Sequence, residues 1–189
     1  GAMSSNTAEI VQEIRREFES MLQYVHESRS ATADQMERGL LRRLLALGGQ
    51  LMVLFFCLRA AEYPRTPVRT AAGVTVPYHG EKKRSYYSIF GKLPVWRPYF
   101  YGRGVGGASP LDEALSLGAD CYSDLVREIA EYLGVGVAYA RVSQFFAHVL
   151  GHALSTQALV QMVGDDASDV TTYYAQQPAP EATTEAAIL

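Results

Sequence analysis

The side chains of this sequence that are best suited to binding a ligand are basic and aromatic, and they cluster between Arg59 and Arg103. Nine Lys or Arg residues stand there against two acidic residues, Glu62 and Glu81, so the segment carries +7 in a chain of net charge −3. Nine aromatic residues lie in the same segment: Tyr63, Tyr78, Tyr86, Tyr87, Phe90, Trp96, Tyr99, Phe100 and Tyr101. Dense cations attract phosphates, and planar rings beside them stack on bases, so the segment predicts a polyanionic partner such as nucleic acid.

Charge separates this segment from a second candidate for DNA binding, the helical segment from Leu111 to Gln177. That segment has only two basic residues, Arg127 and Arg141, against nine acidic ones. Because phosphate contacts come chiefly from Arg and Lys, we expect double-stranded DNA to bind the basic segment instead. The residues expected to contact phosphates are Lys82, Lys83, Arg84, Lys92, Arg97, Arg103, Arg65 and Arg69.

Two plainer interpretations stay open for the basic segment. Its aromatic residues could form only a hydrophobic core, and the adjacent cations Lys82, Lys83 and Arg84 could belong to an ordinary solvated loop.

Catalytic and metal-binding patterns are weak. His148 and His152 have the spacing at which two imidazoles on a helix share a metal, but no metalloprotease Glu and no third ligand accompany them. The glycines from Gly102 to Gly107 lack the Gly-Lys-Ser/Thr ending of a phosphate-binding loop, so we expect a hinge there. The acidic residues between positions 165 and 169 lack the glycine turn of a calcium loop. We therefore expect no catalytic residue, metal or other cofactor in this chain.

Composition favours a soluble, cytoplasmic protein. The chain has 189 residues, enough to bury a core, and its two cysteines, Cys57 and Cys121, are too isolated for a disulfide framework. The apolar run from Leu44 to Leu58 is short for a membrane span and is interrupted by glycine, which favours a buried helix. Residues 1–3 resemble a remnant of tag cleavage, and no secretory leader follows them.

Hydrophobic periodicity predicts a helical hairpin over residues 4–62. The first helix is expected from Thr7 to about Ser28, and the second begins after Thr32, where Gln35 completes a capping box, and runs to about Ala61. The later half of the second helix is apolar nearly all round. It must be buried under the rest of the fold or against a second copy, so we expect a homo-oligomer through the helix from Ala33 to Ala61.

Residues 63–110 have the pattern of a basic, aromatic β-hairpin region. Strands are expected at 74–76 and 85–90, with a turn at Gly91-Lys92 and a return arm at 93–101. Pro94 and Pro98 suggest that this arm is an edge strand or contains a bulge.

The pattern of residues 111–176 predicts an array of helices, at 123–133, at 137–150 and from about Ser155, with short turns like those of helix-turn-helix proteins. The third helix extends to Tyr174 if Asp165 to Asp169 are helical. Residues 177–189 read as a polar linker. The expected fold class is mostly α (α+β), a helical bundle with an inserted small β-hairpin and a carboxy-terminal helix-turn-helix-like array.

Three short motifs resemble a known family. They are Arg84-x-Tyr86-x-Ser88-Ile89-Phe90-Gly91-Lys92, Arg97-x-Tyr99, and Pro110-Leu111-Asp112-x-x-Leu115-x-Leu117. Together they resemble the amino-terminal half of insertion-sequence transposases of the Kra type, over roughly residues 35–189.

The resemblance implies that an RNase H-like catalytic domain of the DDE class would follow, because residues 185–189 look like the start of the strand that delivers its first Asp. This chain would then lack the carboxylates that hold the divalent metal ions, and it would not be an enzyme on its own. Tyr86, Ser88, Gly91 and Asp112 are interpreted as structural, with Gly91 in the turn and Asp112 as a helix cap.

These observations predict a non-catalytic transposase region that binds transposon-end DNA and supports assembly of the transposition complex. The alternative is a helical dimerisation module that does not itself bind DNA.

Overall fold

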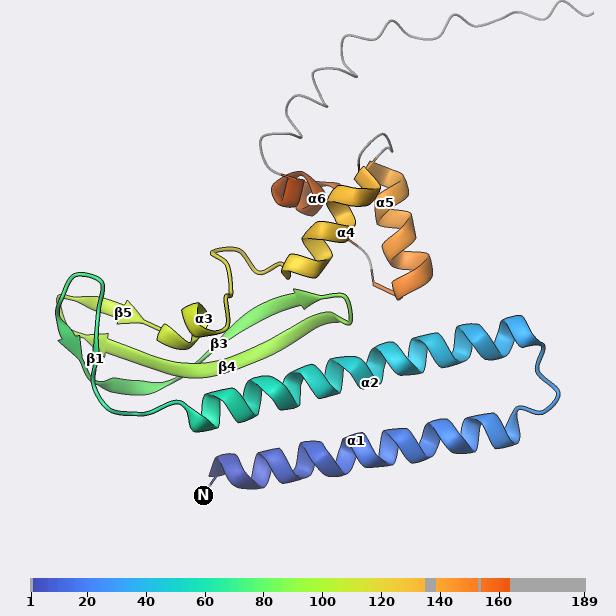
Figure 1. Cartoon of the computed structure of the whole chain (residues 1–189), viewed down its shortest axis with the longest axis horizontal. Helices are drawn as coiled ribbons and strands as arrows, with labels where there is room; N and C mark the ends of the chain where they lie inside the picture. Colours follow the sequence, from blue (N-terminus) through green and yellow to red (C-terminus); the bar gives the residue numbers. More distant parts are fainter. Residues whose placement is uncertain (1, 135–138, 153, 164–189) are drawn as a thin grey trace, which may run out of the picture.

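The computed structural model describes residues 2–134, 139–152 and 154–163 of the chain (Figure 1). The predicted linker, the acidic residues 165–169, the extension of the last helix to Tyr174 and the start of the middle helix at 137–138 lie outside these residues. Within them the protein mixes helices with small antiparallel sheets, which confirms the α+β class.

The chain begins with two long antiparallel helices, α1 (Ala2–Glu27) and α2 (Ala33–Glu62). The predicted capping box is present, since the Gln35 amide donates to Thr32 Oγ1 at 3.2 Å and the Thr32 amide donates to Gln35 Oε1 at 3.0 Å. Helix α1 starts before Thr7, because no glycine or proline interrupts the residues from Ala2 onward. Helices α1 and α2 thus lie where the sequence predicted helices from Thr7 to about Ser28 and from Thr32 to about Ala61.

Helix α2 lies between α1 and the sheet, and glycines allow both contacts to be close. The Tyr24 ring of α1 fills the space where Gly39 has no side chain, and the Phe90 ring lies so close to Gly48 that a Cβ there would overlap it. Larger residues at these positions would force the rings aside.

Helix α2 is also the one helix in the described part of the chain that is long and apolar enough to cross a membrane. Only 17% of its most apolar window is buried. It packs against α1 on one side and β4 on the other. The burial on several sides that the sequence predicted is therefore incomplete in the isolated chain.

Two sheets follow. The strands β1 (Val68–Arg69) and β2 (Thr75–Val76) form a short pair, and β3 (Tyr78–Ser88), β4 (Gly91–Gly102) and β5 (Gly106–Ala108) form an antiparallel sheet in that order. Strand β3 begins seven residues before the predicted Ser85. Its first half is polar and has no apolar alternation to reveal it.

The turn between β3 and β4 is Ile89-Phe90, two residues before the predicted Gly91-Lys92. The Ser88 hydroxyl holds it, accepting from the Phe90 amide and donating to the Gly91 carbonyl, each at 3.0 Å. Gly91 follows the turn with a φ of 102°, a conformation that glycine adopts without strain.

Strand β4 is the middle strand of the sheet, although the sequence predicted an edge strand or a bulge, and the register shift of its pairing with β3 lies between Tyr78 and Gly80. Strand β5 pairs only with Phe100 to Gly102 of β4. Pro94 and Pro98 therefore lie where β4 has β3 on one side and, among the described strands, no partner on the other. The predicted hinge at Gly102–Gly107 is wrong, because these glycines form the tight connection into β5, with the Val105 amide donating to the Gly102 carbonyl at 3.0 Å.

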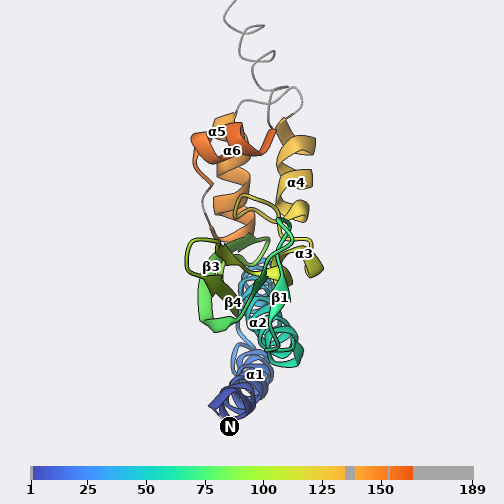
Figure 2. The same ribbon diagram turned by 90° about the vertical axis from the view of Figure 1, so that its left-hand side faces the viewer.

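The short helix α3 (Pro110–Ala114) leads to α4 (Asp124–Gly134), α5 (Tyr139–Phe145), the π-helical turn η1 (Phe146–Leu150) and α6 (Thr156–Val163). These last helices share a core that includes Val126, Phe146 and Leu159, against which Ile89 of the β3–β4 turn packs. In the perpendicular view the elements form a column: α1, α2, the sheet, then α4 to α6 (Figure 2). The β-hairpin thus joins two helical layers.

Candidate nucleic-acid interface

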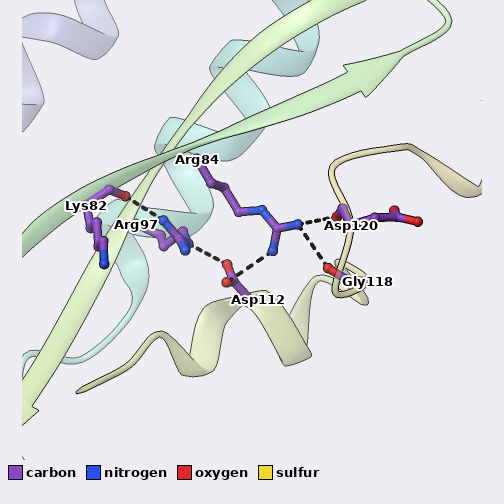
Figure 3. Close-up of polar contacts among 6 residues, drawn as sticks. All are labelled: Lys82, Arg84, Arg97, Asp112, Gly118 and Asp120. Carbon is purple, nitrogen blue, oxygen red and sulfur yellow. Dashed lines mark hydrogen bonds and ion pairs between the residues drawn. The ribbon is translucent and has the colours of Figure 1, made fainter. Parts of the chain in front are cut away.

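Asp112 of α3 holds two arginines of the hairpin (Figure 3). Arg97 of β4 donates from Nε to Asp112 Oδ1 at 2.6 Å, and Arg84 of β3 donates from Nη1 to Asp112 Oδ2 at 3.2 Å. Arg97 Nη1 also donates to the Lys82 carbonyl at 2.8 Å. These contacts, which we call the Asp112 clamp, tie β3, β4 and α3 together.

The clamp is largely removed from solvent. The side chains of Arg97, Arg84 and Asp112 are 10%, 17% and 22% exposed. Arg84 Nη2 makes two further bonds, to the carbonyls of Gly118 at 2.9 Å and Asp120 at 2.6 Å. The guanidinium groups are therefore directed at protein acceptors, and a phosphate could reach them only if these bonds were broken.

Arg65 has a similar position. Its Nη2 donates to Glu81 Oε1 at 2.7 Å, and its Nη1 donates to the carbonyls of Ala60 and Tyr63 at the end of α2. Arg65 thus fastens the end of α2 to β3. Three of the eight residues predicted to contact phosphate are committed to contacts inside the protein.

Asp112 is not the helix cap that the resemblance suggested. Ser109 occupies the cap position of α3, and its side chain makes no capping bond. The Asp112 carboxylate instead bonds side chains 15 and 28 residues away along the chain.

The other five predicted residues lie on the surface: Lys82, Lys83, Lys92, Arg69 and Arg103. Arg69 donates from Nε to the Gly73 carbonyl at 3.2 Å in the β1–β2 turn. The three lysines are all the lysines of the chain, and each lies on the long hairpin of β3 and β4.

Each hairpin lysine lies over an aromatic ring. Lys83 Nζ is 5.8 Å from the centre of the Trp96 ring, Lys92 Nζ is 5.6 Å from Tyr87, and Lys82 Nζ is 4.6 Å from Tyr99. The antiparallel register explains two of these pairs, because Lys83 lies opposite Trp96 and Tyr87 lies opposite Lys92. The rings orient the ammonium groups and leave them in contact with solvent.

The aromatic residues divide into a core set and a surface set. Phe100 is completely buried, and Tyr86 packs edge-on against Phe56 with ring centres 5.3 Å apart. Burial raises the pKa of the Tyr86 hydroxyl, so it stays a neutral donor and acceptor beside Ser123. Trp96 and Tyr101 are 50% and 40% exposed. The core interpretation of the aromatic segment therefore holds for some rings and not for others.

The two histidines considered as metal ligands have different environments. His152 places Nε2 3.0 Å from the Ile89 carbonyl and packs against Phe146, whereas His148 is exposed on η1. Among the described residues, no group of three or more His, Cys, Asp or Glu side chains could hold a metal ion.

Sequence reasoning missed His79 and the specific partners of Tyr99 and Tyr101. His79 lies next to both tyrosines, with ring centres 6.0 and 5.4 Å away. The alternation Tyr99-x-Tyr101 was a visible signal that both rings share one face of a strand.

Comparison of the chain with protein-family models, with curated proteins and with solved structures finds no match.

Proposed function

We propose that this chain is the non-catalytic amino-terminal region of a cytoplasmic transposase of the Kra type. In this proposal it binds the double-stranded DNA of transposon ends and supports assembly of the transposition complex. Its own residues bind no metal or other cofactor, and the divalent metal ions belong to a catalytic domain outside this chain.

The observation that carries the proposal is the set of exposed cations on β3 and β4. Lys82, Lys83 and Lys92 are exposed beside rings, and Arg103 is exposed at the end of the same sheet. Glu81, the nearest acidic residue of β3, is occupied by Arg65 at 2.7 Å and so subtracts little from the positive potential of this surface. Strand alternation places Lys83 and Lys92 on one face of the hairpin and Lys82 on the other. Exposed cations on both faces suit a nucleic-acid backbone that passes around the hairpin.

The Asp112 clamp supports the family part of the proposal. The motif residues Arg84, Arg97 and Asp112 bond one another, and Ser88 and Gly91 shape the turn of the same hairpin. The motifs of the resemblance therefore correspond to one structural unit. Their recurrence in a family would preserve the shape that presents the lysines.

We further propose that α4, α5 and α6 form the helix-turn-helix-like array and contact protein instead of a DNA groove. Glu128 and Glu131 of α4 are exposed, and Arg127 is paired with Asp120 and donates to the Met162 carbonyl at 2.8 Å. This surface would repel a phosphate backbone. The catalytic domain is the partner that the resemblance suggests for it.

The test is the salt dependence of binding to duplex DNA that carries the terminal repeat of the element. Each phosphate contact contributes about 0.9 to the slope of log K against log salt. The double variant Lys82→Ala/Lys83→Ala should therefore lower the magnitude of the slope by about 1.8. Arg15→Ala/Arg16→Ala is the matched control, because it removes two adjacent exposed cations from α1, away from the hairpin.

Equal slopes for the hairpin variant and the wild-type protein would contradict the proposed contacts. Absence of DNA binding at low salt would contradict the proposed function as a whole.

A second candidate function rests on the apolar surface of α1 and α2. Leu41, Leu44, Leu51, Phe55 and Leu58 of α2 are each between 38% and 52% exposed, and they follow the three-and-four spacing of a helical stripe. On α1, Phe18, Leu22 and Val25 are exposed with the same kind of spacing. A second copy of the chain could cover such stripes in a helical bundle, which would make the chain a dimerisation module.

Light scattering separates this candidate from the first. Leu44→Glu/Leu51→Glu should convert a dimer to a monomer, whereas Leu125→Glu, at a leucine of α4 that is 49% exposed, should not. A stable dimer that ignores DNA at low salt would favour the dimerisation module over the DNA-binding region.

A further inference from the structure

An aromatic platform lies at the end of the sheet where β5 pairs with β4. The Tyr99 and Tyr101 rings are stacked with centres 6.3 Å apart and planes 22° apart. The His79 ring contacts both, and Lys82 Nζ lies 4.6 Å from the centre of the Tyr99 ring. We call these four side chains the ring platform.

Gly107 of β5 makes the platform possible. Gly107 pairs with Tyr101 across the sheet, and a Cβ at Gly107 would overlap the Tyr99 ring, with Cε2 only 2.5 Å away. The Tyr99 ring therefore lies across β5, in space that any other residue would occupy. The φ of Gly107 is not in the left-handed region, so the backbone does not require glycine here. The glycine is needed because it leaves space for the Tyr99 ring.

The platform is open to solvent, with Lys82 over one ring and a second cation, Arg103, nearby in the chain. His79, Lys82 and Tyr101 are exposed, Tyr99 is half-buried, and Arg103 is exposed in the turn that follows Tyr101. Stacked rings in a core would need neither the exposure nor the lysine over Tyr99. Proteins bind unpaired nucleotides with rings and cations on a sheet surface. The rings stack on the bases, and the cations contact the phosphates of the backbone.

We infer that the ring platform binds unpaired bases of a DNA strand, so that the preferred ligand is an end with a single-stranded or opened segment. This inference rests on the proposed DNA-binding function and adds the substrate class. Inside a duplex both faces of every base are covered by neighbouring bases, so only an unpaired or terminal base can stack on Tyr99 or Tyr101. The lysines of the hairpin would bind the adjoining duplex through its phosphates.

The test compares two fluorescent DNA probes by anisotropy at fixed salt. One is a short duplex, and the other is the same duplex with one strand extended by several unpaired nucleotides that include 2-aminopurine. Wild-type protein should bind the extended probe more tightly and quench the 2-aminopurine, because a stacked base loses fluorescence. The quenching reports stacking directly, which phosphate contacts alone do not produce.

Tyr101→Val should remove the preference for the extended probe, since valine suits a strand but has no ring. Stacking contributes enough per base for a loss of roughly 5- to 100-fold in affinity for that probe. Tyr101→Phe should retain both preference and quenching. Gly107→Ala gives a second approach, because it displaces the Tyr99 ring without removing any ring. Tyr132→Ala, at an α4 tyrosine that is 83% exposed, is the matched control and should behave as wild type.

The outcomes separate the two proposals. If the wild-type protein binds both probes equally and Tyr101→Val changes neither affinity nor quenching, the ring platform has no role while DNA binding stands. If no probe is bound at low salt, both the inference and the proposed function fail.

Discussion

Lys83 and Arg84 are neighbours in β3, yet they belong to different regions of the molecule. Arg84 is turned toward Asp112 and two loop carbonyls and is 17% exposed, whereas Lys83 is exposed and lies over the surface ring of Trp96. Successive residues of a strand point to opposite faces, so a run of adjacent cations need not form one surface. The basic segment is therefore two sets of cations: one holds the fold together and one faces solvent.

The strongest way to test this division is to remove Asp112. Asp112→Ala leaves two largely buried guanidinium groups without their counterion, and breaking such a pair costs about 3–5 kcal/mol of unfolding free energy. The measurement is the midpoint of chemical denaturation. Asp34→Ala is the control, since Asp34 and Arg38 form a fully surface pair with side chains about 70% exposed, and it should leave the midpoint near wild type. Equal shifts for the two variants would mean that the clamp does not stabilise the fold.

A smaller effect is expected from replacing the two neighbours one at a time. Arg84→Ala should lower the unfolding free energy by about 1–3 kcal/mol, because it leaves the Gly118 and Asp120 carbonyls and part of Asp112 without a donor. Lys83→Ala should leave stability close to wild type and weaken DNA binding. Equal losses of unfolding free energy for Lys83→Ala and Arg84→Ala would contradict the division of the cations into two sets.

The long helices could be predicted from sequence because their signals are local. The capping box of Thr32 and Gln35 and the apolar periodicity that follows lie within one segment, and the structure confirms both. The same applies to α4, where the Ser123 hydroxyl accepts from the Val126 amide at 3.0 Å at the predicted start.

The division of the cations could not be predicted from sequence, because it depends on distant contacts. Asp112 meets Arg84 across 28 residues, and Gly107 matters only because β5 folds back against Tyr99. The glycines at 102–107 predicted a hinge because glycine signals backbone freedom, and a tight turn uses the same freedom. Composition identified the basic segment as a whole, but only the contacts and exposure of each side chain separate its two sets of cations.

The most direct test of the account is a lysine footprint. Lys82, Lys83 and Lys92 are the only lysines of the chain, so an amine-selective reagent followed by mass spectrometry reports on the proposed interface, with the chain's amino terminus as internal control. Addition of transposon-end duplex at low salt should slow the labelling of all three lysines several-fold while the terminal amine reacts as before. Labelling of the three lysines that is unchanged by DNA, under conditions where the DNA is bound, would place the interface elsewhere and contradict the account.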